Sequence, residues 1–93
     1  MDIREILNNI DYTGEFENFN VLNISYDSRK VTEGTLFVAI TGQKHNGHDF
    51  IDEAKKNGAI AVVREKGYKK ISKIVEIQVD DTRLVLPKLA NNF

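Results

Sequence analysis

The chain has 93 residues, so we expect one small domain. It carries 13 basic and 14 acidic side chains, with a net charge of -1. We therefore expect no overall electrostatic attraction to nucleic acid or to a membrane surface. No cysteine is present, which excludes disulfides, thiolate metal sites and a cysteine nucleophile. No apolar run approaches the roughly 20 residues of a membrane helix, and the N-terminus lacks the apolar core of a signal peptide, so the cytoplasm is the expected location.

The first predicted element is a short helix at the N-terminus. Asp2 and Glu5 have the spacing of a capping box. Apolar residues then recur at helical spacing, at Ile3, Ile6, Leu7 and Ile10. This period breaks over residues 11–20, which suit a turn region.

A half-buried strand is predicted at residues 21–27, "VLNISYD". Leu22, Ile24 and Tyr26 alternate there with polar residues, which is typical of a strand with one apolar face. The strand delivers residues 27–29, "DSR", to its C-terminal end.

The middle of the chain predicts a βαβ unit. The apolar run "TLFVAI", residues 35–40, is typical of a strand buried on both faces. A helix follows from about His48, with Gly58 suited to the position just after its end. "AIAVVR", residues 59–64, is the second strand.

The last predicted elements are a strand within residues 71–79, with Ile77 and Val79 as its surest apolar positions, and a C-terminal helix. Asp80, Asp81 or Thr82 is expected to cap that helix. Pro87 removes one backbone hydrogen bond, so the helix is expected to kink or to begin late. Together the elements predict a small single α/β domain whose mixed or mainly parallel sheet is flanked by helices.

The loop "TGQKHNGHDF", residues 41–50, has glycines at P-loop spacing. His48 and Asp49 stand where a P-loop has lysine and a hydroxyl residue, so we reject a complete ATP site. The loop could still hold a polar ligand. The run between the glycines is polar, and the helix start is expected to offer unpaired N–H groups. The run consists of Gln43, Lys44, His45 and Asn46, between Gly42 and Gly47. The alternative, a solvated βα loop whose glycines only satisfy backbone geometry, stays open.

Asp27, Ser28 and Arg29 form a second candidate cluster. Serine can bind a phosphate or ribose oxygen, and arginine can pair with a phosphate or a carboxylate. The alternative is a turn closed by an internal interaction between Asp27 and Arg29. Both this cluster and the loop map to the carboxyl ends of strands, where open α/β sheets place their ligands.

Other polar residues predict less. His45 and His48 lack a third ligand for zinc and are expected to face solvent as loop histidines. A solvated face or a helix cap is expected for Asp52, Glu53, Asp80 and Asp81. No metal site, catalytic pair or nucleic-acid platform is predicted.

The order of motifs from Tyr26 onward resembles the N-terminal domain of the Mur ligases, of the MurE type (UDP-N-acetylmuramoyl-tripeptide synthetase). The matching segments are 27–29 "DSR", Gly34, 36–40 "LFVAI", Gly42, 46–50 "NGHDF" and 58–63 "GAIAVV". Asn46, where aspartate is usual, and Pro87, where helix formers are usual, depart from the family pattern.

The resemblance implies that residues 1–93 bind the UDP part of UDP-N-acetylmuramoyl-L-alanyl-D-glutamate. It assigns contacts with the nucleotide-sugar to Tyr26, Ser28, Gln43, Lys44 and His45. Supporting positions are Asp27, Arg29, Asn46 and Gly47.

The resemblance further implies a parent enzyme that uses ATP and Mg²⁺ to join meso-diaminopimelate or L-lysine to this precursor. The enzyme's central ATP-binding domain and C-terminal domain are not within this sequence. We therefore expect the chain to be a fragment of that enzyme, a domain that is not catalytic and has no cofactor of its own. Two alternatives are the equivalent domain of a MurF-type ligase and a stand-alone interaction module.

Overall fold

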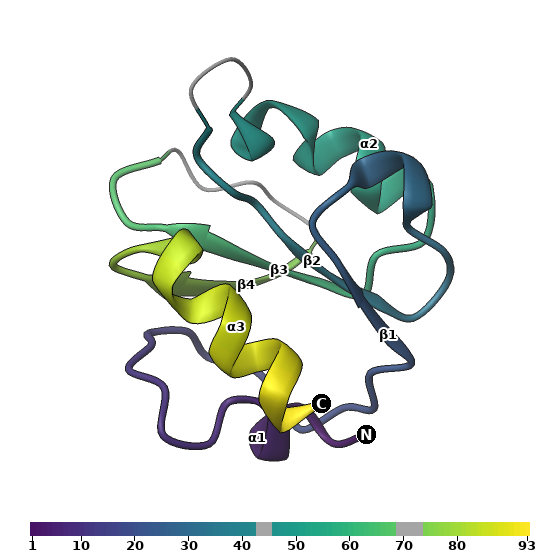
Figure 1. The fold of residues 1–93 in the computed structure, drawn as a ribbon. Coiled ribbons are helices and arrows are strands. Elements are labelled where there is room, and N and C mark those ends of the chain that lie inside the picture. The colour runs from purple at the N-terminus through teal and green to yellow at the C-terminus, as the bar shows by residue number, and fades with distance from the viewer. Residues whose placement is uncertain (43–45, 69–73) are drawn as a thin grey trace.

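The computed structural model describes residues 1–42, 46–68 and 74–93. Its centre is a four-stranded parallel sheet in the order β1-β2-β3-β4 (Figure 1). The strands are β1 (Asn23–Ser25), β2 (Thr35–Val38), β3 (Ala61–Glu65) and β4 (Val75–Val79). The predicted α/β class with a mainly parallel sheet is therefore confirmed.

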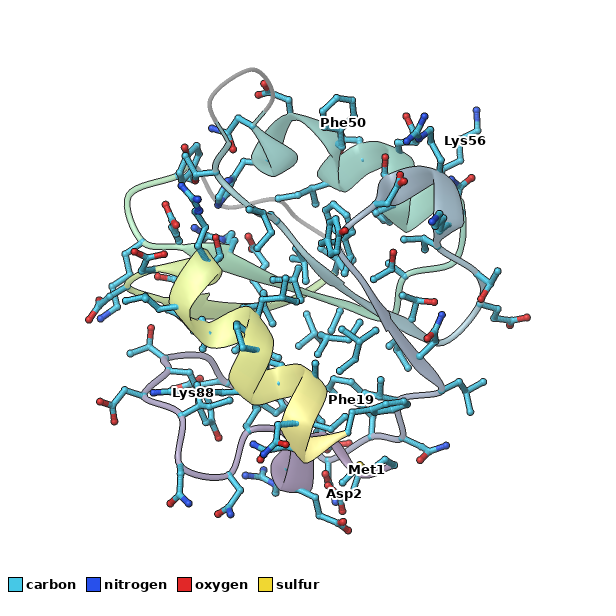
Figure 2. The ribbon with its side chains drawn as sticks, viewed as in Figure 1. Met1, Asp2, Phe19, Phe50, Lys56 and Lys88 are labelled. Carbon is cyan, nitrogen blue, oxygen red and sulfur yellow. The ribbon has the colours of Figure 1, made fainter. Side chains whose placement is uncertain are left out.

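Helices cover both faces of this sheet. They are α1 (Ile3–Ile6), α2 (Ile51–Lys56) and α3 (Thr82–Asn92), with two 3₁₀ turns, η1 (Ser28–Lys30) and η2 (Gly47–Phe50). α2 packs on one face, and α1 and α3 pack on the other (Figure 1). Phe50 on the α2 side and Phe19 beside α3 mark these two layers in Figure 2.

The β2 strand shows why the sheet is stable. All its residues are buried, and its side chains alternate between the two cores. Leu36 and Val38 face the α1 and α3 side, and Phe37 faces α2. The continuous apolar run in the sequence reflects this burial on both faces.

The β1 strand is confirmed, but its predicted burial is partly wrong. Leu22 and Tyr26 are 65% and 64% exposed, and only Ile24 of the alternating set packs against the core. β1 is an edge strand, and α2 and α3 lie nearer the sheet's centre. Tyr26 is therefore left at the surface beside the carboxyl end of the strand.

α3 begins at Thr82, which contradicts the late start that Pro87 was expected to cause. The Asp81 carboxylate caps the helix and accepts hydrogen bonds from the backbone N–H groups of Arg83 and Leu84 at 2.9 and 3.3 Å. Pro87 lies inside a continuous helix, because buried Val85 and Leu89 hold it against the sheet. Among the helices in the described segments, none is long and apolar enough to cross a membrane.

Gly58 ends α2 as predicted. Its φ is +115°, and a Cβ there would lie 2.7 Å from Glu33 Cα. The glycine thus provides both the left-handed turn and the close backbone approach that bring the chain into β3.

Candidate functional site

A cavity of about 460 Å³ opens at the carboxyl ends of β1 and β2. We call it the strand-end cavity. It is lined by Tyr26, Asp27, Ser28, Arg29, Phe37, Ile40, Gly42, Gly47, Phe50 and Glu53. The fold therefore brings the "DSR" cluster to the same cavity as the two loop glycines, as the two strand ends predicted. Its volume lies in the range of small-molecule sites.

Two exposed aromatic rings line this cavity. Tyr26, just after β1, is 64% exposed, and Phe50, at the end of η2, is 36% exposed. Phe37 is buried beneath them as part of the α2 core. Exposed rings at a cavity can stack on a planar base, because every nucleobase has a π face.

Asp27 and Arg29 form the internal turn that the sequence left open. The Asp27 carboxylate accepts from the Arg29 backbone N–H at 3.0 Å and pairs with its guanidinium Nη2 at 3.0 Å. Hydrogen bonding to Arg29 holds the pKa of Asp27 below its usual range. The Arg29 side chain is still 83% exposed, so its guanidinium remains accessible to an anion from the cavity.

Ser28 is the most buried residue of the cluster, at 6% exposure. Its hydroxyl donates to Glu53 Oε1 at 3.0 Å, and its backbone carbonyl accepts from Asn57 Nδ2 at 3.0 Å. Glu53 and Asn57 are four residues apart and share one face of the α2 segment. This face fixes both the backbone and the side chain of Ser28.

In the described part of the chain after β2, the N–H groups at the start of η2 are not free, although the sequence had suggested that they would be. The backbone N–H of Gly47 donates to Ile40 O at 2.7 Å, and that of Asp49 to Asn46 O at 2.9 Å. The N–H of His48 donates to Asn46 Oδ1 at 3.0 Å. This expectation was wrong because Asn46 caps η2 internally.

Gly47 is required by close packing. A Cβ at this position would lie 2.5 Å from the backbone nitrogen of Ile40. The loop closes at Gly47, whose N–H is bound to Ile40 O and is therefore not available to a phosphate. The predicted contacts Gln43, Lys44 and His45 lie outside the described residues.

His48 is buried at 8% exposure, so the expectation of a solvent-facing histidine was wrong. Its Nε2 accepts from the Glu65 backbone N–H at 3.0 Å, which requires Nε2 to be unprotonated, and its Nδ1 lies 2.7 Å from Asn46 Oδ1. The neutral ring with its proton on Nδ1 satisfies both contacts. Burial lowers the pKa of His48, in agreement with the neutral form.

Tyr68 completes the surroundings of His48. The two rings stack with centroids 3.7 Å apart, and the Tyr68 hydroxyl accepts from Asn46 Nδ2 at 2.6 Å. Buried Arg64 donates to the backbone carbonyls of Glu65 and Tyr68, both at 3.1 Å, and so orders the turn that carries Tyr68. Asn46, one of the two departures from the family pattern, thus has hydrogen-bond partners for both its side-chain nitrogen and its side-chain oxygen.

The Glu65 carboxylate connects the loop to α3. Its Oε1 accepts from Thr41 Oγ1 at 3.0 Å. Its Oε2 accepts from the backbone N–H and the hydroxyl of Thr82, both at 3.0 Å. These contacts hold the segment entering the loop in a fixed position relative to the sheet.

Four residues of the strand-end cavity were not predicted as site residues from the sequence: Phe37 and Ile40, which belong to the buried apolar run, and Phe50 and Glu53. In the sequence, Phe50 was noted as part of the motif at residues 46–50, and a solvated face or a helix cap was expected for Glu53. They are three residues apart, so one side of this helical segment can present both. That spacing was the available signal, but only the packing of α2 against η1 shows that this side lines a cavity.

Metals require sets of ligand side chains, such as His, Asp and Glu. Among the residues that the structure describes, no group of three or more His, Asp or Glu side chains could hold an ion. The N–H groups of Gly47, His48 and Asp49 already have acceptors within the chain, so they are not available to the phosphates of ATP.

Comparison with known proteins places these features in a family. The family described as "Mur ligase family, catalytic domain" matches residues 20–93. The chain is 45% identical over 93 residues to UDP-N-acetylmuramoyl-L-alanyl-D-glutamate--2,6-diaminopimelate ligase of Alkaliphilus metalliredigens, covering 100% of this chain and 19% of the relative. It is 42% identical over 92 residues to the ligase of the same name from Clostridioides difficile, covering 99% and 19%.

Solved structures show the same relationship. The MurF ligase of Thermotoga maritima in complex with ADP matches with a TM-score of 0.64 and 40% identity, over 73% of this chain and 16% of that chain. The Acinetobacter baumannii ligase for D-alanyl-D-alanine matches with a TM-score of 0.74 over 96% of this chain and 20% of its own, at 21% identity, and shows the shared fold.

The chain spans about a fifth of the length of the curated relatives it matches. Those relatives are ligases of the MurE type, and they align with the whole of this chain. The chain therefore belongs to the Mur ligase family, as the N-terminal domain of the MurE type.

Proposed function

We propose that this domain binds the UDP part of UDP-N-acetylmuramoyl-L-alanyl-D-glutamate through the strand-end cavity. The observation that carries the proposal is the cavity itself, which unites Tyr26, Ser28 and Arg29 with the glycine loop after β2. The curated relatives are named for this UDP-linked substrate, which supports the choice of ligand.

Each described residue has a role suited to its chemistry. The exposed ring of Tyr26 stacks on the uracil, with Phe50 as a second apolar wall. Ser28 hydrogen bonds to the nucleoside. Arg29, accessible beside its partner Asp27, provides a cation for the diphosphate. Gln43, Lys44 and His45 remain proposed contacts, on the basis of the family resemblance.

The parent protein is proposed to be an ATP- and Mg²⁺-dependent ligase of peptidoglycan precursor synthesis. The names of the relatives favour 2,6-diaminopimelate as the amino acid that it adds. In that ligase, this domain is proposed to supply recognition of the UDP-linked substrate.

Amide NMR of the 93-residue chain tests the proposal, with UDP as the titrant. We expect saturable shifts at Tyr26, Ser28 and Arg29, and weaker binding in Ser28→Ala. Shifts confined to residues outside the cavity, or none at millimolar UDP, would contradict it. A MurF-type role, the alternative that the sequence left open, is the weaker candidate, because the Thermotoga maritima enzyme matches 73% of this chain and the MurE-type relative matches 100%. The substrate that the parent gene's product accepts would distinguish the two.

A further inference from the structure

The hydrogen bond between Ser28 and Glu53 has a fixed direction. An ionised carboxylate can only accept, so the Ser28 hydroxyl must be the donor in the 3.0 Å contact with Glu53 Oε1. A serine hydroxyl carries one proton. With that proton directed at Glu53, the Ser28 oxygen presents only lone pairs to the strand-end cavity.

The same carboxylate determines which part of a nucleotide can lie beside Ser28. Glu53 lines the cavity, and its negative charge disfavours a phosphate at this end. A neutral group with an N–H or O–H donor suits both the charge and the lone pairs of Ser28. Tyr26 and Phe50 line the same cavity, so this neutral group is a planar base held between or against aromatic rings.

On the basis of the proposed function, we propose that Glu53 is a positioning residue that selects uracil over cytosine by holding the Ser28 hydroxyl as an acceptor. Uracil has an N–H at ring position 3, which can donate to Ser28. Cytosine has a lone pair at that position, so two acceptors would face each other. Sites that require a hydrogen bond reject an analogue that cannot make it.

The position of Ser28 is not left to Glu53 alone. Asn57 holds the Ser28 carbonyl at 3.0 Å, and Asp27 caps η1 through Arg29 N. Removing the Glu53 carboxylate should therefore release the hydroxyl rotor while Ser28 stays in place. The freed hydroxyl can then donate to cytosine, so the selectivity falls without loss of the site.

The test measures dissociation constants of UDP and CDP for the 93-residue chain by calorimetry. We expect UDP to bind about tenfold or more tightly than CDP in the wild type, and the ratio to fall to about twofold in Glu53→Ala. Glu53→Gln, whose amide oxygen can still accept from Ser28, should retain most of the ratio. Asp52→Ala removes an exposed charge from the same helix and should leave the ratio unchanged.

A second probe needs no variant. UDP methylated at N3 of the uracil lacks the donor and should bind the wild type about tenfold or more weakly than UDP. Equal wild-type affinities for UDP and CDP, or an unchanged ratio in Glu53→Ala, would overturn the role of Glu53. The proposed function would stay intact in that case if UDP still shifts the amide NMR signal of Ser28. Absence of UDP binding would overturn both.

Discussion

The imidazole Nε2 of His48 accepts a hydrogen bond from the backbone N–H of Glu65 at 3.0 Å, which joins η2 to the carboxyl end of β3. The contact requires a neutral ring. Protonation of Nε2 would place two donors against each other and break the link. The loop that borders the strand-end cavity is thus held by a contact that protonation of His48 would break, and burial lowers the pKa of this ring.

The first prediction concerns stability and pH. Burial lowers the pKa of His48 below its usual 6.5, so at pH values between the two pKa values the unfolded chain binds more protons than the folded chain. The stabilising contribution is complete above pH 6.5 and decreases as the pH falls through the lowered folded pKa. Urea unfolding at pH 7.5 and at pH 5.5 should show a lower free energy of unfolding at the lower pH. His48 can contribute a slope of at most about 1.4 kcal/mol per pH unit.

The two histidines of the chain provide the control for that slope. His48→Gln should reduce the pH dependence in this window, whereas His45→Gln should retain it. An equal slope in His48→Gln and the wild type would contradict the assignment to His48.

The second prediction concerns Asn46→Asp, which restores the residue usual in the family. The new carboxylate would face the Nδ1 proton of His48, now 2.7 Å from the Asn46 oxygen, and would stabilise the cation. The pKa of His48 should rise relative to the wild type, as followed by NMR of its Cε1 proton. An unchanged or lower pKa would show that Nδ1 does not carry the proton.

The third prediction concerns Glu65. Glu65→Ala leaves the buried Thr82 hydroxyl and N–H without their acceptor and also removes the contact with Thr41, so the free energy of unfolding should fall by about 2 to 4 kcal/mol. Lys66→Ala breaks an exposed salt bridge with Asp80, 3.3 Å long, and should change the free energy of unfolding by less than about 1 kcal/mol. Urea denaturation measures both, and similar losses would refute the importance of Glu65.

The fourth prediction compares two glycines with positive φ. Gly58→Ala must fit a Cβ 2.7 Å from Glu33 Cα at φ +115°, whereas Gly67→Ala at φ +92° meets no atom within 4 Å. Gly67→Ala should lower the free energy of unfolding by about 1 to 2 kcal/mol, from backbone strain alone. Gly58→Ala should lower it by at least about 1 kcal/mol more. Thermal unfolding of the two variants measures the difference, and equal costs would show that the chain relaxes around Gly58.

The sequence predicted those parts of the fold that depend on local pattern. The run around Phe37 indicated a buried strand, Gly58 indicated the end of a helix, and Asp81 was among the expected caps; all are confirmed. Each depends on periodicity or on backbone conformation within a few residues. The convergence of Ser28 and the loop glycines on one cavity also followed, because parallel strands place their carboxyl ends at one edge.

Tertiary contacts could not be predicted in this way. Whether His48 is buried depends on Tyr68 and Glu65, which lie 20 and 17 residues later in the chain. In the sequence, Glu53 looks like one acid of a solvated helix face. Its contact with Ser28, 25 residues earlier, forms only when α2 packs against η1. Hydrogen bonds of this range leave no periodic signal.

The fifth prediction concerns Tyr26, whose exposed ring is proposed to stack on the base. Tyr26→Ala should weaken UDP binding about five- to 100-fold, and Tyr26→Phe should retain most of the affinity, because stacking needs the ring. Leu84→Ala removes another exposed apolar side chain, outside the cavity, and should have little effect. Calorimetry measures the three, and a Tyr26→Phe variant as weak as Tyr26→Ala would contradict stacking.

The central claim, that the strand-end cavity binds the UDP part of the substrate, is tested most directly by intermolecular nuclear Overhauser effects between bound UDP and the 93-residue chain. We predict effects from the uracil H5 and H6 protons to the rings of Tyr26 and Phe50. Tyr26 also borders a second cavity, beside Leu86 and Phe93, so Phe50 distinguishes the two. Effects to Leu86 and Phe93 without Phe50, or no effects at saturating UDP, would contradict the claim.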